Sequence, residues 1–240
     1  MISGIKGFLP VSMLDWEEKL CAVIFMGGCS FRCPFCHNSD LVLHPEALED
    51  YSWDEIADHL NEKRGWLDGV TVTGGEPTLY AELAQLLALI RDLGLKTKLD
   101  TNGYQPEAVK ELLAAGLVDF IAMDVKAAPG GYAKAAGRLI DLARINRSIS
   151  TIIQSGLPHE FRCTVVPGFT DLPDLLQIAA WIDGARRLTL QQYRSSEALD
   201  PALRDLKPFP DDTLHTWAEA CAQVIPTAVR GAGAYAPPGL

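Results

Sequence analysis

The sequence predicts an α/β protein in which strands and helices alternate around one parallel sheet or barrel. Three observations favour this class: short β-rich runs alternate with amphipathic segments, each strand precedes its helix, and six such units follow one another from about Lys19. The 240 residues are 48% hydrophobic, which is enough to bury one core. Because no repeat or linker divides the sequence, we expect a single domain over residues 1–231.

The first two units show clear starts and stops. A strand is expected at 20–25, ahead of a cysteine-rich loop, and the capping-box sequence at 52–55 starts the following helix. The second strand is expected at 69–73. Its helix has an apolar stripe at helical spacing from Leu83 to Ile90, and Gly94 is placed to stop it.

The later units repeat this order. Further strands are expected at 95–100, 118–123, 160–166 and 187–192, and helices from Pro106 to Gly116 and over 138–154, 172–181 and 212–224. The Pro- and Gly-rich residues 232–240 are expected to form a tail that frays.

Composition limits the function classes. The chain has 31 Asp and Glu residues against 21 Lys and Arg residues, and its net charge of -10 would repel a nucleic acid because no cluster of basic residues offsets it. It starts with no signal-like segment and has no apolar run of about 20 residues, so we expect a cytoplasmic protein without a membrane partner. Three of its six cysteines crowd into eight positions, which indicates metal or redox chemistry rather than a disulfide framework.

Polar segments follow the ends of the predicted strands. In a parallel sheet or barrel, reactive groups gather at the carboxyl ends of the strands, because the loops there vary while packing holds the strands. The segments at these ends are 29–36, 74–77, 100–103, 124–126 and 167–168. One face of the molecule would therefore hold them all.

The cysteine loop offers three thiols, from Cys29, Cys33 and Cys36, which are close enough in sequence to bind three irons of a [4Fe-4S] cluster. The fourth iron would keep an open position for a substrate or cofactor. A zinc site completed by His37 or His44 is an alternative, although structural zinc loops more often pair two CxxC knuckles.

A second alternative is a four-cysteine cluster that includes Cys21, Cys163 or Cys221. Cys21 and Cys163 lie in predicted strands and Cys221 lies in a predicted helix. All three are more simply small core residues.

With Phe35 before its last cysteine and Gly74–Pro77 after the second strand, the CxxxCxxC loop resembles the radical S-adenosylmethionine (SAM) superfamily. Within it, the chain resembles the glycyl-radical-enzyme activating enzymes, in particular the activating proteins of anaerobic ribonucleoside-triphosphate reductase. Supporting phrases lie at 27–29, 33–38, 99–103, 123–126, 164–168 and 191–194. The resemblance runs from about Gly4 to Gly231 and implies a partial (β/α)6 TIM-like barrel.

The resemblance also implies a chemistry. Cys29, Cys33 and Cys36 would hold a [4Fe-4S] cluster, whose open iron chelates SAM, and reductive cleavage of SAM would give a 5′-deoxyadenosyl radical. This radical would abstract a glycine Cα hydrogen from a partner glycyl radical enzyme, here an anaerobic ribonucleotide reductase. The implied electron donor is a flavodoxin or ferredoxin.

Several residues are implied to bind SAM. Gly74, Gly75 and Glu76 would meet its methionyl amino group, since glycine admits close backbone approach, although either glycine alone would be read as a turn. Phe35 would shield the adenine, its alternative being core filler or a surface aromatic.

Charged residues at later strand ends complete the implied site. Asp100 and Asp124 would need partners if buried, and helix capping is their simpler alternative. The resemblance implies a monovalent cation beside the cofactor carboxylate at Asp100, Thr101 and Asp124, with Asp124 and Lys126 also near the ribose or peptide. Arg162 is open between a two-pronged bond to the cofactor carboxylate and a solvated strand-end charge.

Two residues carry no firm role. Arg194 stands where the pyruvate formate-lyase activating branch has a histidine, so a role there is not carried over. His37, as a lone histidine, is compatible with merely satisfying a backbone carbonyl.

Two rival functions stay open. The same cleavage of SAM to a radical would serve a small-molecule substrate, as in 7-carboxy-7-deazaguanine synthases. A closed, purine-sized pocket would favour this function, whereas a wide opening of the barrel would favour a peptide substrate. A non-enzymatic iron-sulfur or zinc protein is the other rival. Gly74–Pro77 argue against it, because an electron-transfer module needs no second ligand-binding loop.

Overall fold

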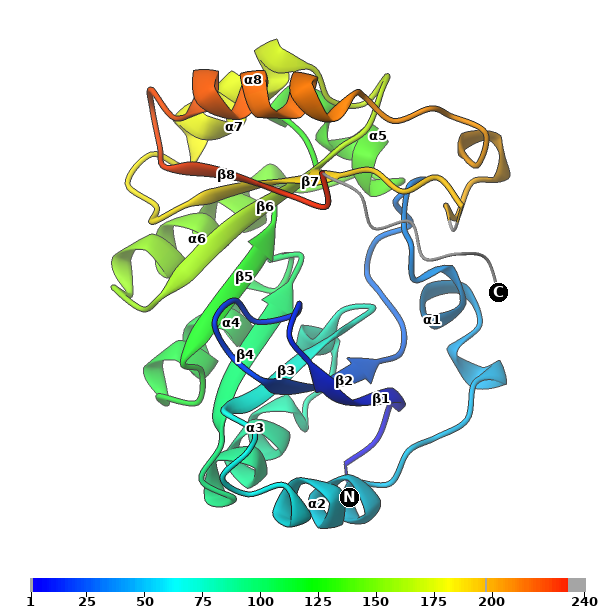
Figure 1. Cartoon of the computed structure of the whole chain (residues 1–240), viewed down its shortest axis with the longest axis vertical. Coiled ribbons are helices and arrows are strands. Elements are labelled where there is room, and N and C mark those ends of the chain that lie inside the picture. The colour runs from blue at the N-terminus through cyan, green and yellow to red at the C-terminus, as the bar shows by residue number, and fades with distance from the viewer. Residues whose placement is uncertain (1, 197, 233–240) are drawn as a thin grey trace.

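The computed structural model describes residues 2–196 and 198–232, which form one eight-stranded sheet in sequential order from β1 to β8. The strands are β1 (Ile5–Ser12), β2 (Cys21–Met26), β3 (Gly69–Gly74), β4 (Lys96–Thr101), β5 (Phe120–Asp124), β6 (His159–Val165), β7 (Leu188–Gln192) and β8 (Thr227–Arg230). β1 pairs antiparallel with β2, and every later pair is parallel. The sheet curves with β1 and β8 at its two ends, which makes a partial barrel (Figure 1).

Eight α-helices are present in the described part of the chain, and most of them cover the outer side of the sheet. They are α1 (Ser39–Leu43), α2 (Trp53–Glu62), α3 (Leu83–Asp92), α4 (Pro106–Ala114), α5 (Tyr132–Ala136), α6 (Leu142–Gln154), α7 (Leu172–Trp181) and α8 (Asp211–Cys221). In Figure 1, α2, α3, α4, α6, α7 and α8 surround the convex side, whereas α1 and the cysteine loop lie on the concave side. The cysteine loop therefore lies on the inner side of the barrel.

Local sequence explains where these helices begin. The Ser52 side chain accepts a hydrogen bond from the Glu55 backbone N–H, as the capping-box sequence predicts for α2. Pro106 occupies the first turn of α4, where a missing N–H costs nothing. α5 ends at Gly137, whose φ of 66° gives the left-handed conformation that stops a helix.

The six predicted strands are confirmed as β2 to β7, each within two residues of its expected ends. The two edge strands β1 and β8 were not predicted. The helix predicted at 138–154 is present as α6, which starts four residues later than expected because Asp141 caps it by accepting a hydrogen bond from the Ala143 N–H. Of the predicted tail, residues 233–240 lie outside the described residues.

The sheet is buried on both sides, yet its concave side carries polar groups. Val70, Val72 and Leu99 have no exposed surface and pack in the core. Polar side chains are buried among the same strands: Thr71, Lys98, Asp100, Glu160, Arg162 and Thr189. Since buried polar groups need partners, this side of the sheet is expected to contain a network of polar contacts.

Two further observations concern the whole chain. Cys21, Cys163 and Cys221 are buried and free, in agreement with their reading as core residues. Among the residues that the structure describes, no helix has both the length and the apolar character that crossing a membrane would require.

Candidate active site

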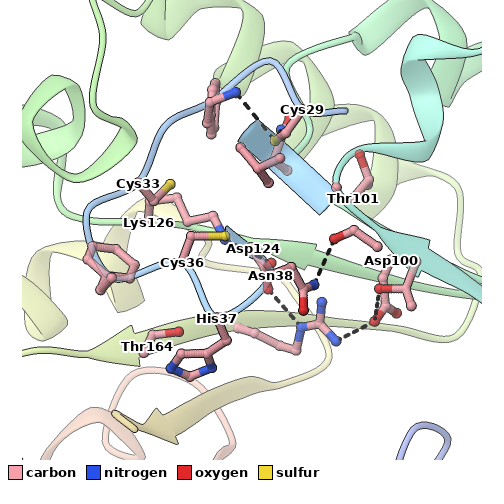
Figure 2. A pocket seen from close by; sticks show the side chains of 18 of the residues that line it. Cys29, Cys33, Cys36, His37, Asn38, Asp100, Thr101, Asp124, Lys126 and Thr164 are labelled. Atoms are coloured by element: carbon pink, nitrogen blue, oxygen red, sulfur yellow. Dashed lines mark hydrogen bonds and ion pairs between the residues drawn. The ribbon is translucent and has the colours of Figure 1, made fainter. Parts of the chain in front are cut away.

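A cavity of about 350 Å³ lies at the carboxyl ends of β2 to β7. It brings together eleven sequence-predicted residues: Cys29, Cys33, Phe35, Cys36, Gly74, Gly75, Asp100, Thr101, Asp124, Lys126 and Arg162. Figure 2 shows Cys33, Cys36 and Lys126 at one side of the cavity and Asp100 and Thr101 at the other. Glu76 does not line it, and Arg194 is exposed elsewhere.

The three thiols of the cysteine loop all face this cavity. Cys33 is 6% exposed, and the Cys29 sulfur accepts a hydrogen bond from the Phe31 N–H at 3.3 Å. Burial raises the pKa of Cys29 to about 11 and that of Cys33 to about 12, while the Lys126 ammonium acts in the opposite direction on both. The Cys29 and Cys33 thiols are therefore protonated at neutral pH until a metal displaces the protons.

The donor set fits a cubane cluster. In the described part of the chain, no three His, Cys, Asp or Glu side chains converge to hold one metal ion. A [4Fe-4S] cluster does not require such convergence, because each thiolate binds a different iron. Cys29, Cys33 and Cys36 would hold three irons, and the cavity beside them leaves room for a ligand on the fourth.

Neither histidine proposed for a zinc site is placed as a clear fourth ligand. His37 lines the cavity, and its ring lies parallel to Tyr193 at a centroid distance of 6.2 Å. His44 lies away from the cavity lining and faces Glu46, with 3.6 Å between Nδ1 and Oε1.

Backbone hydrogen bonds from distant segments hold the cysteine loop. The N–H groups of Leu199 and Asp200 donate to the carbonyls of Cys36 and Pro34 at 3.1 and 2.8 Å. Both donors come from the long connection between β7 and α8. The loop geometry thus depends on a segment more than 160 residues away in sequence.

Gly74 and Gly75 at the end of β3 allow the loop that follows this strand to pack directly against the cysteine loop. Gly74 has a φ of 115°, and a Cβ at Gly75 would lie 1.8 Å from the Gly28 carbonyl oxygen. The Gly75 N–H donates to the Met26 carbonyl and the Glu76 N–H donates to the Gly28 carbonyl, both at 2.8 Å. A residue with a Cβ at Gly75 would push the two loops apart.

Glu76 links this loop to the one after β4. It is fully buried, and its carboxylate accepts hydrogen bonds from both the N–H and hydroxyl of Thr78, from the Thr101 hydroxyl at 2.7 Å and from the Asn102 N–H at 2.6 Å. Burial raises the pKa of Glu76, and these donors oppose that rise. Both carboxylate oxygens are thus engaged inside the protein, and the predicted contact of Glu76 with SAM stays a prediction.

Opposite the thiols, five side chains form an alternating row of charges, here called the charge row. Lys98 Nζ lies 2.8 Å from Asp100 Oδ1, and Arg162 Nη1 lies 2.8 Å from Asp100 Oδ2. Arg162 Nε lies 2.8 Å from Asp124 Oδ1, and Lys126 Nζ lies 2.9 Å from Asp124 Oδ2. Figure 2 shows Asp100, Asp124 and Lys126 along one wall of the cavity.

The charge row fixes the ionisation of its members. Burial alone would raise the pKa of Asp100 and Asp124, but Arg162 with the two lysines holds both below their usual range. Burial would likewise lower the pKa of Lys126, and Asp124 with the cysteine sulfurs keeps it above its usual value. Of the three cations in the row, Arg162 and Lys126 line the cavity, whereas Lys98 pairs with Asp100 from outside the lining.

The sequence allows two roles for Arg162, a bond to the cofactor carboxylate or a solvated charge at the strand end. In the structure Arg162 is buried and bridges the carboxylates of Asp100 and Asp124. The residues in or near the site that the sequence did not single out include Asn38, whose side chain donates to the Gly74 carbonyl at 2.9 Å, Asn102 and Lys98. Lys98 had a signal, because it alternates with Asp100 along a strand and so shares its face.

Comparison with known proteins agrees with this geometry. The family model described as "Radical SAM superfamily" matches residues 23–182. A protein of Methanocaldococcus jannaschii that bears the name of a glycyl-radical enzyme activating enzyme is 30% identical over 213 residues, covering 87% of either chain. The pyruvate formate-lyase-activating enzyme of Streptococcus mutans is 31% identical over 177 residues, covering 67% of this chain and 65% of that one.

Solved structures show the same fold. SuiB of Streptococcus suis matches with a TM-score of 0.67 at 15% identity, over 85% of this chain and 47% of SuiB. This chain therefore spans about half the length of SuiB. Another SuiB structure with a TM-score of 0.65 has SAM bound.

The matched residues 23–182 contain the three cysteines, both glycines and all five members of the charge row. Enzymes of the matched family use a [4Fe-4S] cluster and SAM, and the three thiols beside an open cavity fit that requirement. The chain belongs to the radical SAM superfamily and is an enzyme of the type that activates glycyl radical enzymes.

Proposed function

We propose that this enzyme abstracts a hydrogen from a glycine Cα in an anaerobic ribonucleoside-triphosphate reductase and so activates it. The observation that carries the activating role is the 30% identity to a protein named for it over 87% of both chains. The choice of reductase rests on the resemblance of phrases such as 33–38 and 191–194. A cytoplasmic location belongs to the same proposal.

The chain's own residues divide the work within the cavity. Cys29, Cys33 and Cys36 would hold the cluster, and the Lys126 ammonium stabilises their thiolates. Gly74 and Gly75 would let the cofactor approach the backbone closely, and buried Phe35 excludes water. When bound, the cluster and SAM supply the reductive one-electron chemistry.

The charge row would orient the cofactor. Arg162 and Lys126 line the cavity and would offer cationic donors to the methionyl carboxylate of SAM, and the resemblance implies that Asp124 and Lys126 lie near the ribose or a peptide. A monovalent cation at Asp100, Thr101 and Asp124 stays a prediction of the resemblance. It would have to compete with Lys98, Arg162 and Lys126, which already pair with both carboxylates.

The test uses protein reconstituted with iron and sulfide without oxygen and reduced with dithionite. SAM is added, first alone and then with an anaerobic ribonucleotide reductase or a pyruvate formate-lyase, and 5′-deoxyadenosine and the glycyl-radical signal in electron paramagnetic resonance are measured. We expect the signal with the reductase and its loss when the reductase glycine is changed to Ala.

Three outcomes would contradict parts of the proposal. A signal with pyruvate formate-lyase alone would reassign the partner. SAM cleavage without a signal on either protein would favour the small-molecule reading. No cleavage by a loaded and reduced cluster, with the same result for Cys36→Ala, would favour an electron-transfer or zinc protein.

A further inference from the structure

The outer side of the cysteine loop is surrounded by basic side chains. Arg32, Lys134 and Arg138 are exposed and Arg144 is partly buried. Three of them lie within residues 134–144, and the fold brings Arg32 of the cysteine loop beside this segment. We call these four residues the basic face.

Two members of the basic face contact the cysteine loop directly. Arg32 stands between the first two cysteines, and its Nη1 donates to the Cys29 carbonyl at 2.7 Å. Arg138 Nη1 donates to the Ser30 carbonyl at 2.9 Å, from the segment after α5. Their charges are therefore fixed at the outer surface of the loop that would hold the cluster.

Ring contacts place the other two members nearby. The guanidinium groups of Arg138 and Arg144 lie over the Tyr104 ring, 5.7 and 4.3 Å from its centroid. Lys134 Nζ lies 4.6 Å from the centroid of the Phe169 ring. These contacts restrict the cations to one side of the molecule.

The basic face contrasts with the rest of an acidic protein. Segment 130–147 has four Lys and Arg residues and a single acidic residue, Asp141, whose carboxylate caps α6. Segment 40–62 has eight Asp and Glu residues and no Lys or Arg. Beside the basic face, Leu139 is 88% exposed, and interfaces often combine arginine with an exposed apolar side chain of this kind.

We propose that the basic face is the docking site of an acidic one-electron carrier that reduces the cluster held by Cys29, Cys33 and Cys36. The carrier loses one electron and the cluster gains it, with no transfer of an atom or proton. Opposite charges accelerate the encounter, and such redox complexes are small and short-lived. The proposal rests on the radical SAM chemistry and is independent of which protein receives the glycyl radical.

The test compares two reductants. A reduced acidic flavodoxin is mixed with the cluster-loaded protein, without any glycyl-radical partner, and the loss of cluster absorbance is followed by stopped flow. For Lys134→Glu/Arg138→Glu we expect the rate at low ionic strength to fall at least about tenfold. Reduction by dithionite should change less than about twofold, and salt should slow the flavodoxin reaction of the unaltered protein.

The matched control reverses two charges at the opposite end of the sheet. Lys63 follows α2 and Lys96 is the first residue of β4, and both are exposed. Lys63→Glu/Lys96→Glu changes the net charge equally and should leave the flavodoxin rate within about twofold of the unaltered protein. As a readout without a cluster, titration of flavodoxin into cluster-free protein should show weaker binding only for the first variant.

The outcomes separate cleanly. Equal slowing in both variants, or none in the first, would overturn the proposal. A second result would also overturn it: Lys134→Glu/Arg138→Glu lowers glycyl-radical formation with dithionite, while reduction of the cluster by flavodoxin stays normal. The basic face would then bind the substrate protein. Iron content is measured throughout, and Lys134→Gln/Arg138→Gln replaces the first variant if that variant fails to retain iron.

Discussion

Gly75 is the position at which the missing side chain matters most directly. A Cβ there would overlap the Gly28 carbonyl, and backbone on both sides leaves no flexible group to move. We expect Gly75→Ala to destabilise the protein by about 1–3 kcal/mol, the usual cost of overpacking, and to weaken SAM binding. Thermal unfolding and equilibrium binding of SAM would measure both effects.

Gly130 provides the control for this substitution. A Cβ at Gly130 meets no atom within 4 Å, and its backbone does not have a positive φ. Gly130→Ala should leave stability within about 0.5 kcal/mol. Equal losses in the two variants would show that the contact between the loops is unimportant.

Arg162 is expected to stabilise the site in a pH-dependent way. Because the folded-state pKa values of Asp100 and Asp124 lie below their usual range, the stability that they contribute is complete above about pH 5 and is lost as the pH falls further. Arg162→Gln leaves two buried carboxylates with one cation fewer, and removing one partner of a buried ion pair costs about 3–5 kcal/mol.

Melting temperatures of cluster-free protein between pH 3 and pH 8 would test this. The difference between the unaltered protein and Arg162→Gln should be largest above about pH 5 and should shrink towards pH 3. A difference that is constant over this range would mean that Arg162 contributes packing rather than charge.

The composition of the site could be predicted from the sequence, but its internal contacts could not. Eleven positions predicted at strand ends line one cavity, because chemistry-bearing residues in α/β folds collect there. The charge row was beyond reach, since which cation meets which carboxylate depends on the alignment of β4, β5 and β6 in space. Glu76 was predicted from its motif, but its four internal hydrogen bonds had no signal in sequence.

Among the elements, the inner strands were predictable and the edges were not. β2 to β7 show apolar β-rich runs because both of their faces are covered. β1 contains Gly7 and Pro10 and exposes Leu9 and Val11, so it lacks the burial that produces a strand signal. β8 has four residues, all partly buried, which is too short for a periodic pattern.

The connection between β7 and α8 is expected to act as a support for the cysteine loop. Asp200 has a φ of -80°, close to that of proline, so Asp200→Pro removes its hydrogen bond to the Pro34 carbonyl with little backbone strain. We expect the reconstituted protein to lose iron to a chelator several times faster. Asp200→Ala, which keeps the N–H group, is the control, and equal rates in both variants would refute the role of this hydrogen bond.

At the scale of the molecule, a groove on the open side of the barrel lies next to the cavity. This groove of about 590 Å³ lies between the β1 residues Lys6 and Gly7 and the β7–α8 residues Ser196 and Arg204. It shares three lining residues with the cavity, namely Phe25, His37 and Asn38. The groove therefore adjoins the site at these three residues.

Narrowing this groove should separate two activities. If a protein loop reaches the site along it, Ser196→Trp should lower glycyl-radical formation at least about tenfold through steric exclusion, while cleavage of SAM without a partner stays unchanged. Ser150→Trp, at an exposed position of α6, is the control. Normal radical formation in Ser196→Trp would show that the partner approaches from another side.

The hydrogen bonds from Leu199 and Asp200 to the cysteine loop also concern biosynthesis. During translation the cysteines leave the ribosome early, because they lie within the first 36 residues, but the groups that fix their loop follow more than 160 residues later. For most of its synthesis, a nascent chain therefore carries three thiols on a loop that lacks its hydrogen bonds to the β7–α8 connection. We therefore expect the loop to reach the geometry described above only after the β7–α8 connection has been synthesised.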